Sequence, residues 1–274
     1  MIVYLASFPR CGHAFTRDLI LLNYRYLTAN GYDVGEDQFP PKLEVRDAPS
    51  AEAGFADGLV WNQWIRTYAT GYPNTARRRM LRAPALEALT PDLRRALAAE
   101  DNLFFVKTHE RPFDAYFPGE MVVQTVRHPG AAIASHYRLE LDVSERDDHV
   151  LQDMIRGFSF GGRWSDYHDA WRLARVPRLL LRYEDMVQDQ PKAVVDIGAF
   201  LGLPALAEAS IKTMPMKAAN ERNPLRNRGA GAHGWREVFN ADEERLLWEI
   251  HAAAAAGFGY LPDEPPSAPA TARP

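Results

Sequence analysis

The chain has 274 residues, 46% of them hydrophobic, with 32 basic and 36 acidic side chains and a formal net charge of −4. This size predicts one large domain with a substantial core, and the acidic balance argues against a nucleic-acid partner, which would need clustered Lys and Arg. The single cysteine, Cys11, excludes an internal disulfide framework and a cysteine-rich zinc site, and makes the cytoplasm the default location. The apolar start of the chain is too short for a signal peptide or a membrane span, so no membrane association is expected.

Four short apolar runs are typical of buried strands, at residues 2–6, 103–107, 121–126 and 179–183. Helical periodicity between and after them predicts helices at 14–27, from 129 onward, and at 164–175, 191–201, 205–213 and 240–257. Pro129 suits the first turn of its helix, and Asn240 with Glu243 has the form of a capping box. This alternation favours an α/β fold with a mostly parallel sheet and helices on both faces.

Three segments are predicted to lie outside these elements. Residues 33–58 and 140–149 are rich in charge and are expected to be loops near the substrate, because loops over the carboxyl edge of a sheet commonly act as lids. Residues 262–274 are rich in Pro, Ala, Ser and Thr, have little to bury, and are predicted to be disordered. Residues 1–261 are therefore expected to form a single domain.

The first strand runs through a tight turn directly into a helix, an arrangement that forms an anion site. Backbone N–H groups at a helix N-terminus attract anions, and Arg10 adds a full positive charge. No stretch of the chain has the Gly-x-x-x-x-Gly-Lys-[Ser/Thr] pattern of nucleoside triphosphatases. The expected anion is therefore not a magnesium triphosphate.

A second strand-to-helix turn repeats this logic. Arg127 follows the strand at 121–126, and Ser135 stands eight residues later in the next helix. The two side chains are placed to hold one phosphate from two sides through charge-assisted bonds. The spacing alone leaves open that Arg127 is a solvated charge and Ser135 an ordinary helical serine.

Taken in order, five motifs resemble those of the sulfotransferases that use 3′-phosphoadenosine-5′-phosphosulfate (PAPS). The first is similar to the 5′-phosphosulfate loop of that family, usually aromatic-Pro-Lys-Ser-Gly-Thr-Thr-Trp, and the second matches its Lys-Thr-His segment. The third matches the 3′-phosphate motif, in which an Arg and a Ser stand eight apart. The others are similar to the Tyr-Glu-Asp turn and to a late Arg that precedes a Trp by seven residues. In this chain the motifs are Phe8–Phe15, Lys107–His109, Arg127 with Ser135, Tyr183–Met186, and Arg228 with Trp235.

The resemblance implies a P-loop-like three-layer sandwich and transfer of a sulfuryl group from PAPS to a hydroxyl of a small-molecule acceptor, a phenol or an alcohol. Adenosine 3′,5′-bisphosphate (PAP) would be the second product, no metal would be required, and homo-oligomers are left open. It assigns the phosphosulfate to Arg10, Lys107 and the residues Cys11, Gly12, His13, Ala14, Phe15 and Thr16. It assigns the 3′-phosphate to Arg127, Ser135, Arg228 and Gly229, and the adenine to Phe15, Tyr183, Ser210 and Ile211.

The resemblance also gives His109 the role of general base, because a neutral imidazole is a suitable base near neutral pH. Glu110 is the rival base, since some relatives that act on sugars use a carboxylate. The chain departs from the family pattern at several positions: Arg10 replaces Lys, His13 and Ala14 replace Thr-Thr, Phe15 replaces Trp, and Gly229 and Ala230 replace Lys-Gly. His13 is expected to replace a lost hydroxyl contact through a ring N–H.

Two other functions remain to be weighed against this one, a nucleotide or sugar kinase and a non-catalytic nucleotide-binding protein. Trp164, His168 and Trp171 fall on one helical face and are expected to be core residues with a satisfied histidine. The histidines at 128, 136 and 233 lack the spacing of metal ligands. An aromatic group at Trp61, Trp64, Tyr68 and Tyr72 fits either an acceptor wall or a structural cluster.

Overall fold

The computed structural model describes residues 1–24, 26, 28–30, 81–82, 91–99, 101, 103–143, 150–214 and 234–262. The chain divides into two compact units, each described by itself below. The first unit comprises Met1–Ser7, Gly12–Thr125 and Leu173–Met214, and the second comprises Phe8–Cys11, Val126–Arg172 and Pro215–Pro274. A single domain over 1–261 stays a prediction, and all but the first residue of the predicted tail at 262–274 lies outside the described residues.

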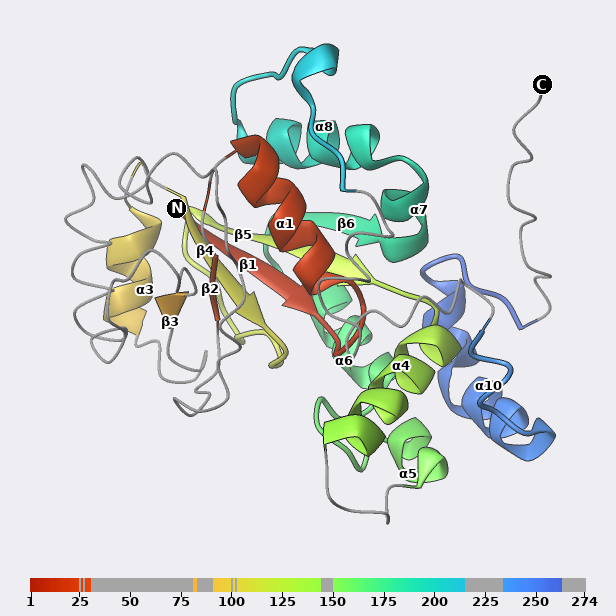
Figure 1. The fold of residues 1–274 in the computed structure, drawn as a ribbon. Coiled ribbons are helices and arrows are strands. Elements are labelled where there is room, and N and C mark those ends of the chain that lie inside the picture. Colours follow the sequence, from red (N-terminus) through yellow and green to blue (C-terminus); the bar gives the residue numbers. More distant parts are fainter. Residues whose placement is uncertain are drawn as a thin grey trace, which may run out of the picture. The chain divides into compact units, whose positions relative to one another are not determined.

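Among the described residues, a six-stranded sheet has the order β3-β2-β4-β1-β5-β6 (Figure 1). The strands pair in parallel: β1 pairs with β4 and β5, and β2 pairs with β3 and β4. All residues of β1 and β4 are buried, which explains their continuous apolar runs. The strands are β1 (Ile2–Ser7), β2 (Thr28–Asn30), β3 (Leu81–Arg82), β4 (Phe104–Thr108), β5 (Glu120–Val126) and β6 (Arg178–Arg182).

The four predicted strands are confirmed with shifts of a residue at their ends. The short strands β2 and β3 were not predicted, because two or three residues carry no detectable periodicity. Since the strands paired with β1 are parallel to it, the carboxyl ends of β1, β4 and β5 lie at the same edge of the sheet. The chain switches sides there, because β4 and β5 flank β1, and such switch points are where open α/β sheets bind ligands.

The first unit also contains helices α1 (His13–Tyr24), α3 (Pro91–Ala98), α7 (Tyr183–Gln188) and α8 (Gln190–Leu201), and the 3-10 turn η3 (Glu208–Ser210). Helix α1 packs on β1 and α8, and α3 packs on β1. Asp189 caps α8 by accepting the N–H of Lys192 at 2.9 Å, and Gly202 ends it with a φ of 66°. Helix α1 stops at Tyr24, short of the predicted residue 27.

The predicted helix at 205–213 is wrong, since only η3 is helical there. Pro204 follows the helix-ending Gly202, and the three residues of η3 are exposed. A short helix with little to pack against is not stable in water. The chain instead continues as an extended segment that two side-chain amides hold in place.

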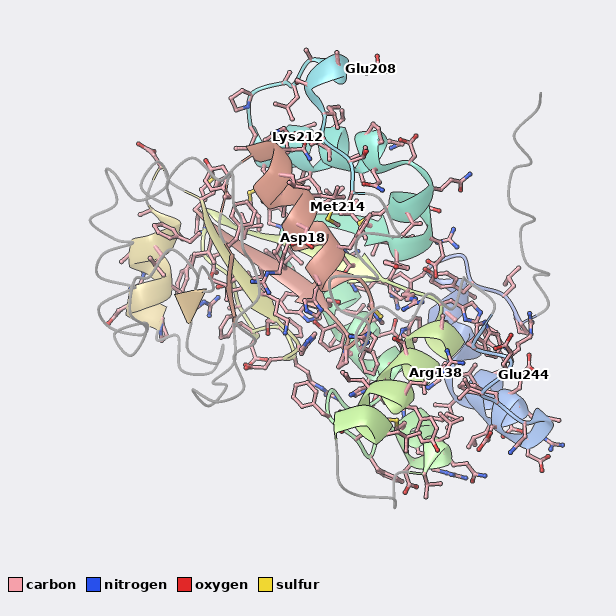
Figure 2. All side chains as sticks on the ribbon, viewed as in Figure 1. Asp18, Arg138, Glu208, Lys212, Met214 and Glu244 are labelled. Atoms are coloured by element: carbon pink, nitrogen blue, oxygen red, sulfur yellow. The ribbon has the colours of Figure 1, made fainter. Side chains whose placement is uncertain are left out.

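Asn23 and Gln190 each bind this extended segment as a neighbouring strand would. Asn23 donates to the carbonyl of Lys212 at 2.9 Å and accepts its N–H at 2.8 Å. Gln190 does the same to Met214, at 2.8 Å and 2.6 Å. Lys212 and Met214 are labelled beside α1 in Figure 2. The two amides therefore fasten residues 212–214 to α1 and α8.

The second unit contains α4 (Pro129–Val143), α5 (Leu151–Arg156), α6 (Trp164–Leu173) and α10 (Ala241–Ala256). Helices α4, α5 and α10 pack on one another. Pro129 is the first residue of α4, and Asn240 with Glu243 forms the predicted capping box of α10. Trp164, His168 and Trp171 are fully buried, which confirms their prediction as core residues. No helix of the described ranges is long and apolar enough to cross a bilayer.

The predicted loop at 140–149 is partly wrong, because residues 140–143 form the last turn of α4. Leu139 and Glu140 are strong helix formers, and their mixed polarity suits a half-exposed helix face better than a loop. Residues 144–149 and the predicted loop at 33–58 lie outside the described residues.

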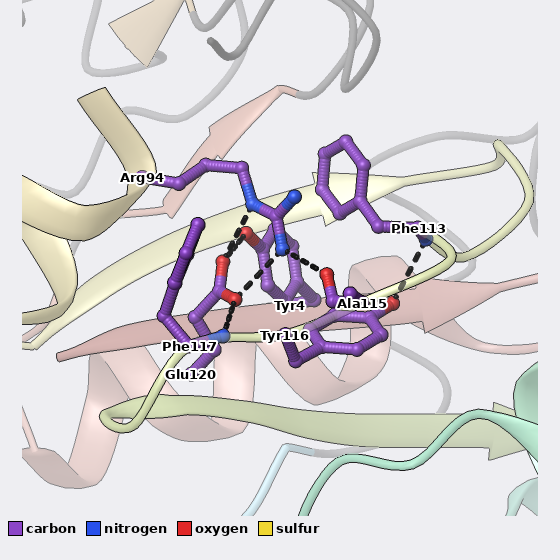
Figure 3. Close-up of polar contacts among 7 residues, drawn as sticks. All are labelled: Tyr4, Arg94, Phe113, Ala115, Tyr116, Phe117 and Glu120. Atoms are coloured by element: carbon purple, nitrogen blue, oxygen red, sulfur yellow. Dashed lines mark hydrogen bonds and ion pairs between the residues drawn. The ribbon is translucent and has the colours of Figure 1, made fainter. Parts of the chain in front are cut away.

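A buried ion pair sits at the amino edge of the sheet, in the first unit (Figure 3). Arg94 donates through Nε and Nη2 to both carboxylate oxygens of Glu120, at 2.8 and 2.7 Å, and Nη2 also donates to the carbonyl of Ala115 at 2.7 Å. The hydroxyl of Tyr4 donates to Glu120 at 2.5 Å, and the N–H of Phe117 donates at 2.6 Å. Burial, followed by the charge of Glu120, raises the pKa of Tyr4, so the hydroxyl keeps its proton. The network fastens α3 to β1 and β5.

Candidate active site

The turn that follows β1 belongs to the second unit and has a strained backbone. Cys11 N–H donates to the Phe8 carbonyl at 3.1 Å, which closes a β-turn with Pro9 in its second position. Arg10, in the third position, has a φ of 67°, the left-handed conformation that glycine adopts most easily. A non-glycine residue held there costs about 1–3 kcal/mol, and such strain tends to be kept at functional sites.

Side chains from α4 and α6 and the segment before α6 hold this turn. The ring of Phe8 is buried against Tyr167 and His168, with centroids 5.9 and 6.2 Å apart. Gly161 lies against Pro9 so closely that a Cβ would stand 2.7 Å from the proline ring. The Sγ of Cys11 lies 3.7 Å from Nε2 of His168, and both side chains are fully buried. The side chain of Cys11 therefore faces the core.

Two predicted phosphate residues meet at Arg10. The Nε of Arg10 donates to the hydroxyl of Ser135 at 3.0 Å, and Nη1 of Arg127 donates to the backbone carbonyl of Arg10 at 3.2 Å. The sequence assigned Arg10 to one end of the donor and Ser135 to the other, whereas the structure brings them into contact. Two guanidinium groups and a hydroxyl converge here, a donor set that suits an oxyanion.

An aromatic cage fixes the residues that follow Arg127. The ring of His128 stacks on Trp235 with centroids 4.9 Å apart and meets the rings of Trp248 and Tyr260 edge-on. Trp235 also covers Gly130, where a Cβ would stand 2.6 Å from the indole. The start of α4 is therefore packed on all these rings. The predicted residues Arg228 and Gly229 lie outside the described residues.

In the first unit, helix α1 begins next to Gly12, whose φ is 105°. The ring of Tyr183 covers Gly12 so closely that a Cβ would stand 2.6 Å from it. Thr16 N–H donates to the Gly12 carbonyl at 3.0 Å, and its hydroxyl donates to the same carbonyl at 3.3 Å. Both donors of Thr16 thus bond within the first turn of the helix. The preceding amides, including that of Ala14, belong to the open first turn.

His109 comes directly after β4, and its ring is fixed by the backbone of β1. Its Nδ1 lies 2.5 Å from the carbonyl of Ser7. Because a carbonyl can only accept, Nδ1 carries the hydrogen, and the lone pair of the ring lies on Nε2. His13 meets this ring edge-on with centroids 4.9 Å apart. Lys107, two residues before His109, is fully buried.

Of the residues predicted to contact the adenine, the structure shows only Phe15 and Tyr183 in contact with each other. Phe15 and Tyr183 meet edge-on, with centroids 6.1 Å apart and planes at 73°. This is an edge-to-face pair and not the parallel sandwich that would enclose a base. Ser210 is exposed in η3, and Ile211 follows it in the extended segment. Across the described ranges, no three His, Cys, Asp or Glu side chains are placed to hold a metal ion.

The chain belongs to the sulfotransferase-domain family, whose model matches residues 3–223. Its fold is similar to mouse sulfotransferase SULT7A1 complexed with PAP, at 14% identity and a TM-score of 0.56, covering 94% of this chain and 87% of that one. It is also similar to retinol dehydratase, solved with androsterone and PAP, at 18% identity and a TM-score of 0.57, covering 93% of this chain and 80% of that one. A second structure of retinol dehydratase, with retinol and PAP, matches at 16% identity and a TM-score of 0.53, covering 93% and 81%. No curated protein matches the chain.

The α/β class and the P-loop-like sandwich expected from the sequence are thereby confirmed. Sequence reasoning missed two residues that contact this site. His168 was predicted only as core, and His128 was noted only beside Arg127 and rejected as a metal ligand. Their partners, Cys11 and Trp235, lie more than a hundred residues away along the chain, so no local pattern announces either contact.

Proposed function

We propose that the protein is a PAPS-dependent sulfotransferase that transfers a sulfuryl group to a hydroxyl of a small-molecule phenol or alcohol and releases PAP. The observation that carries this proposal is the convergence of Arg127 and Ser135 on Arg10. Three residues that sequence motifs placed in two separate phosphate contacts form one hydrogen-bonded group in a chain of the sulfotransferase family.

Donor binding follows from the charges and helix ends of the site. In the proposal, the phosphosulfate is bound at a helix N-terminus, which stabilises negative charge. The residues that bind it are Arg10, Cys11, Gly12, His13, Ala14, Phe15, Thr16 and Lys107. Arg127, Ser135, Arg228 and Gly229 bind the 3′-phosphate. Phe15, Tyr183, Ser210 and Ile211 contact the adenine. PAPS is a co-substrate, and sulfuryl transfer from it needs no β,γ-bridging metal.

His109 is the general base of the proposed reaction. Its Nε2 takes the proton of the acceptor hydroxyl while the Ser7 carbonyl holds Nδ1–H, so the ring presents the tautomer that a base needs. The acceptor oxygen then attacks sulfur as the bond to the phosphate oxygen breaks, in a loose in-line transition state governed by positioning and charge neutralisation. General-base catalysis of this kind contributes about 10²–10⁴ in rate. Glu110, whose N–H donates to the Thr108 hydroxyl at 2.9 Å, is the rival base.

The acceptor is proposed only as a class. Two similar structures contain retinol or androsterone, each a small apolar molecule with a hydroxyl group. The aromatic residues Trp61, Trp64, Tyr68 and Tyr72, which suggested an apolar acceptor, lie outside the described residues. The proposal includes a cytoplasmic location, based on the single cysteine, with no nucleic-acid or membrane partner and with homo-oligomers left open.

Two measurements test this function. Calorimetry with PAP and with magnesium ATP separates a sulfotransferase from a kinase, because the proposal predicts clearly tighter binding of PAP. Mass-detected transfer from PAPS to a panel of phenols, alcohols, sugars and amines then identifies the acceptor class. Tighter binding of magnesium ATP would contradict the proposal, and a His109→Ala variant with unchanged turnover would remove the assigned base.

A further inference from the structure

The contact between Cys11 and His168 joins the strained turn to a residue that the proposed reaction does not use. The atoms Sγ and Nε2 lie 3.7 Å apart, within the range of a hydrogen bond to sulfur, and neither side chain is exposed. One hydrogen lies between them in either tautomer of His168. The thiol donates to a bare Nε2, or an Nε2–H donates to the sulfur.

His168 is itself held rigidly in the second unit. Its ring packs against Trp164 and Phe258, with centroids 4.6 and 5.5 Å apart, and against Tyr167 at 5.3 Å. Burial, followed by the charge of His251, lowers the pKa of His168 to about 3, so the ring is neutral at working pH. A fixed, neutral ring is a suitable partner for a thiol because it adds no charge beside the anion loop.

The turn requires such a partner. Arg10 adopts a positive φ that its side chain disfavours, so the turn keeps this shape only if its neighbours hold it. Cys11 closes the turn through its N–H to the Phe8 carbonyl at 3.1 Å. The contact of its side chain with His168 therefore fixes Cys11, the residue whose backbone N–H closes the turn.

We propose that His168 is a positioning residue for the donor, holding Cys11 so that the Phe8–Cys11 turn keeps Arg10 in its anion-binding conformation. The inference rests on the proposed function, because it assigns His168 a role in binding PAPS and PAP. The proposal gives His168 no contact with substrate, and its role is exerted through Cys11.

A double-mutant cycle measures this role with PAP as the probe. We expect Cys11→Val and His168→Phe each to weaken PAP binding by about three- to ten-fold, the equivalent of one lost hydrogen bond. The double variant should be no weaker than either single variant, because both remove the same contact. Cys11→Ser keeps a hydrogen-bonding atom and should restore most of the affinity, whereas independent additive losses would overturn the proposal.

The matched control is His251, another buried histidine of this unit. Its Nε2 lies 3.0 Å from the carbonyl of Ile155, and no described hydrogen bond or ring contact joins it directly to the Phe8–Cys11 turn. We expect His251→Gln to lower the melting temperature while leaving PAP affinity unchanged. If it weakens PAP binding as much as His168→Phe does, the effect is a general loss of packing and the proposal fails.

Hydrogen exchange at the Cys11 amide tests the turn without any ligand. That amide should exchange at least ten-fold faster in Cys11→Val, a small substitution that preserves apolar packing, and at the wild-type rate in His251→Gln. Unchanged exchange in Cys11→Val would overturn the positioning role. If the wild-type protein fails to bind PAP, the proposed function falls, while this measurement still decides whether the contact holds the turn.

Discussion

The guanidinium of Arg10 donates directly to the hydroxyl of Ser135, with Nε and Oγ 3.0 Å apart. Ser135 thus holds the charged end of a residue whose backbone is strained. An incoming phosphate oxygen would receive bonds from groups that are already oriented, which reduces the entropy lost on binding.

We therefore predict that Ser135→Ala weakens PAP binding by about ten-fold, since one hydrogen bond to the phosphate and the orientation of Arg10 are lost together. Calorimetry measures the affinity, and Ser165→Ala in α6 is the matched control, a serine whose hydroxyl donates only to neighbouring Asp166 among the bonds described for it. Equal affinity of Ser135→Ala and wild type would show that Ser135 does not contribute to the anion site.

His109→Gln should abolish most turnover and leave PAP binding intact. The amide N–H₂ of Gln can still donate to the Ser7 carbonyl, but the side chain cannot accept a proton, so the rate should fall about 10²–10⁴-fold. Single-turnover transfer from PAPS to an acceptor identified in the panel measures the chemical step. Should Glu110→Gln cause the larger loss, Glu110 rather than His109 is the base.

Mild acid should destabilise the protein through two buried histidines. Burial lowers the pKa of His168 to about 3 and that of His251 to about 4, below the ordinary value of 6.5 that applies once the chain unfolds. The two neutral histidines contribute fully to the free energy of unfolding above pH 6.5. This contribution is lost as the pH falls from 6.5 toward 4 for His251 and toward 3 for His168, because only the unfolded chain takes up these protons in that range. Each should contribute a slope of about 1.4 kcal/mol per pH unit to the free energy of unfolding.

Urea unfolding between pH 7 and pH 4 checks this slope. In His251→Gln the slope of the free energy of unfolding against pH should decrease by about 1.4 kcal/mol per pH unit, the contribution of one histidine, since Gln does not titrate. A stability curve whose slope is the same in wild type and variant would exclude His251 as a source of the acid sensitivity.

Removing one partner of the buried ion pair should cost more than removing both. Glu120→Leu leaves the Arg94 charge buried without its carboxylate and should destabilise the fold by about 3–5 kcal/mol. The double variant with Arg94→Leu should recover part of this loss, because no uncompensated charge remains. Denaturant titration of the wild type, the two single variants and the double variant gives the coupling energy between Arg94 and Glu120. A double variant less stable than Glu120→Leu would contradict the argument.

Gly130→Ala tests the packing at the start of α4. The added methyl group would stand 2.6 Å from the indole of Trp235, so this ring must shift and its stacking on His128 is disturbed. Overpacking of this kind typically costs about 1–3 kcal/mol. Thermal unfolding and the tryptophan emission spectrum report the two effects, and an unchanged spectrum with unchanged stability would show that Trp235 moves aside at no cost.

Local patterns predicted the elements but not the contacts between them. The strands at 2–6 and 121–126, Pro129 and the Asn240 capping box were correct because each depends on neighbouring residues only. The helix at 205–213 failed since its apolar residues had nothing to pack on. The motif residues Arg10 and Ser135 were found individually, but their direct bond joins positions 125 residues apart and depends on tertiary packing.

The left-handed conformation of Arg10 carries an evolutionary consequence. Glycine at position 10 would relax the turn backbone, so mutations there that raise thermal stability should be easy to find and should remove the charge that the anion site uses. Selection for stability alone would thus erase this residue. In the proposed function, Arg10 occupies the least favourable backbone position of the turn because its charge binds the donor.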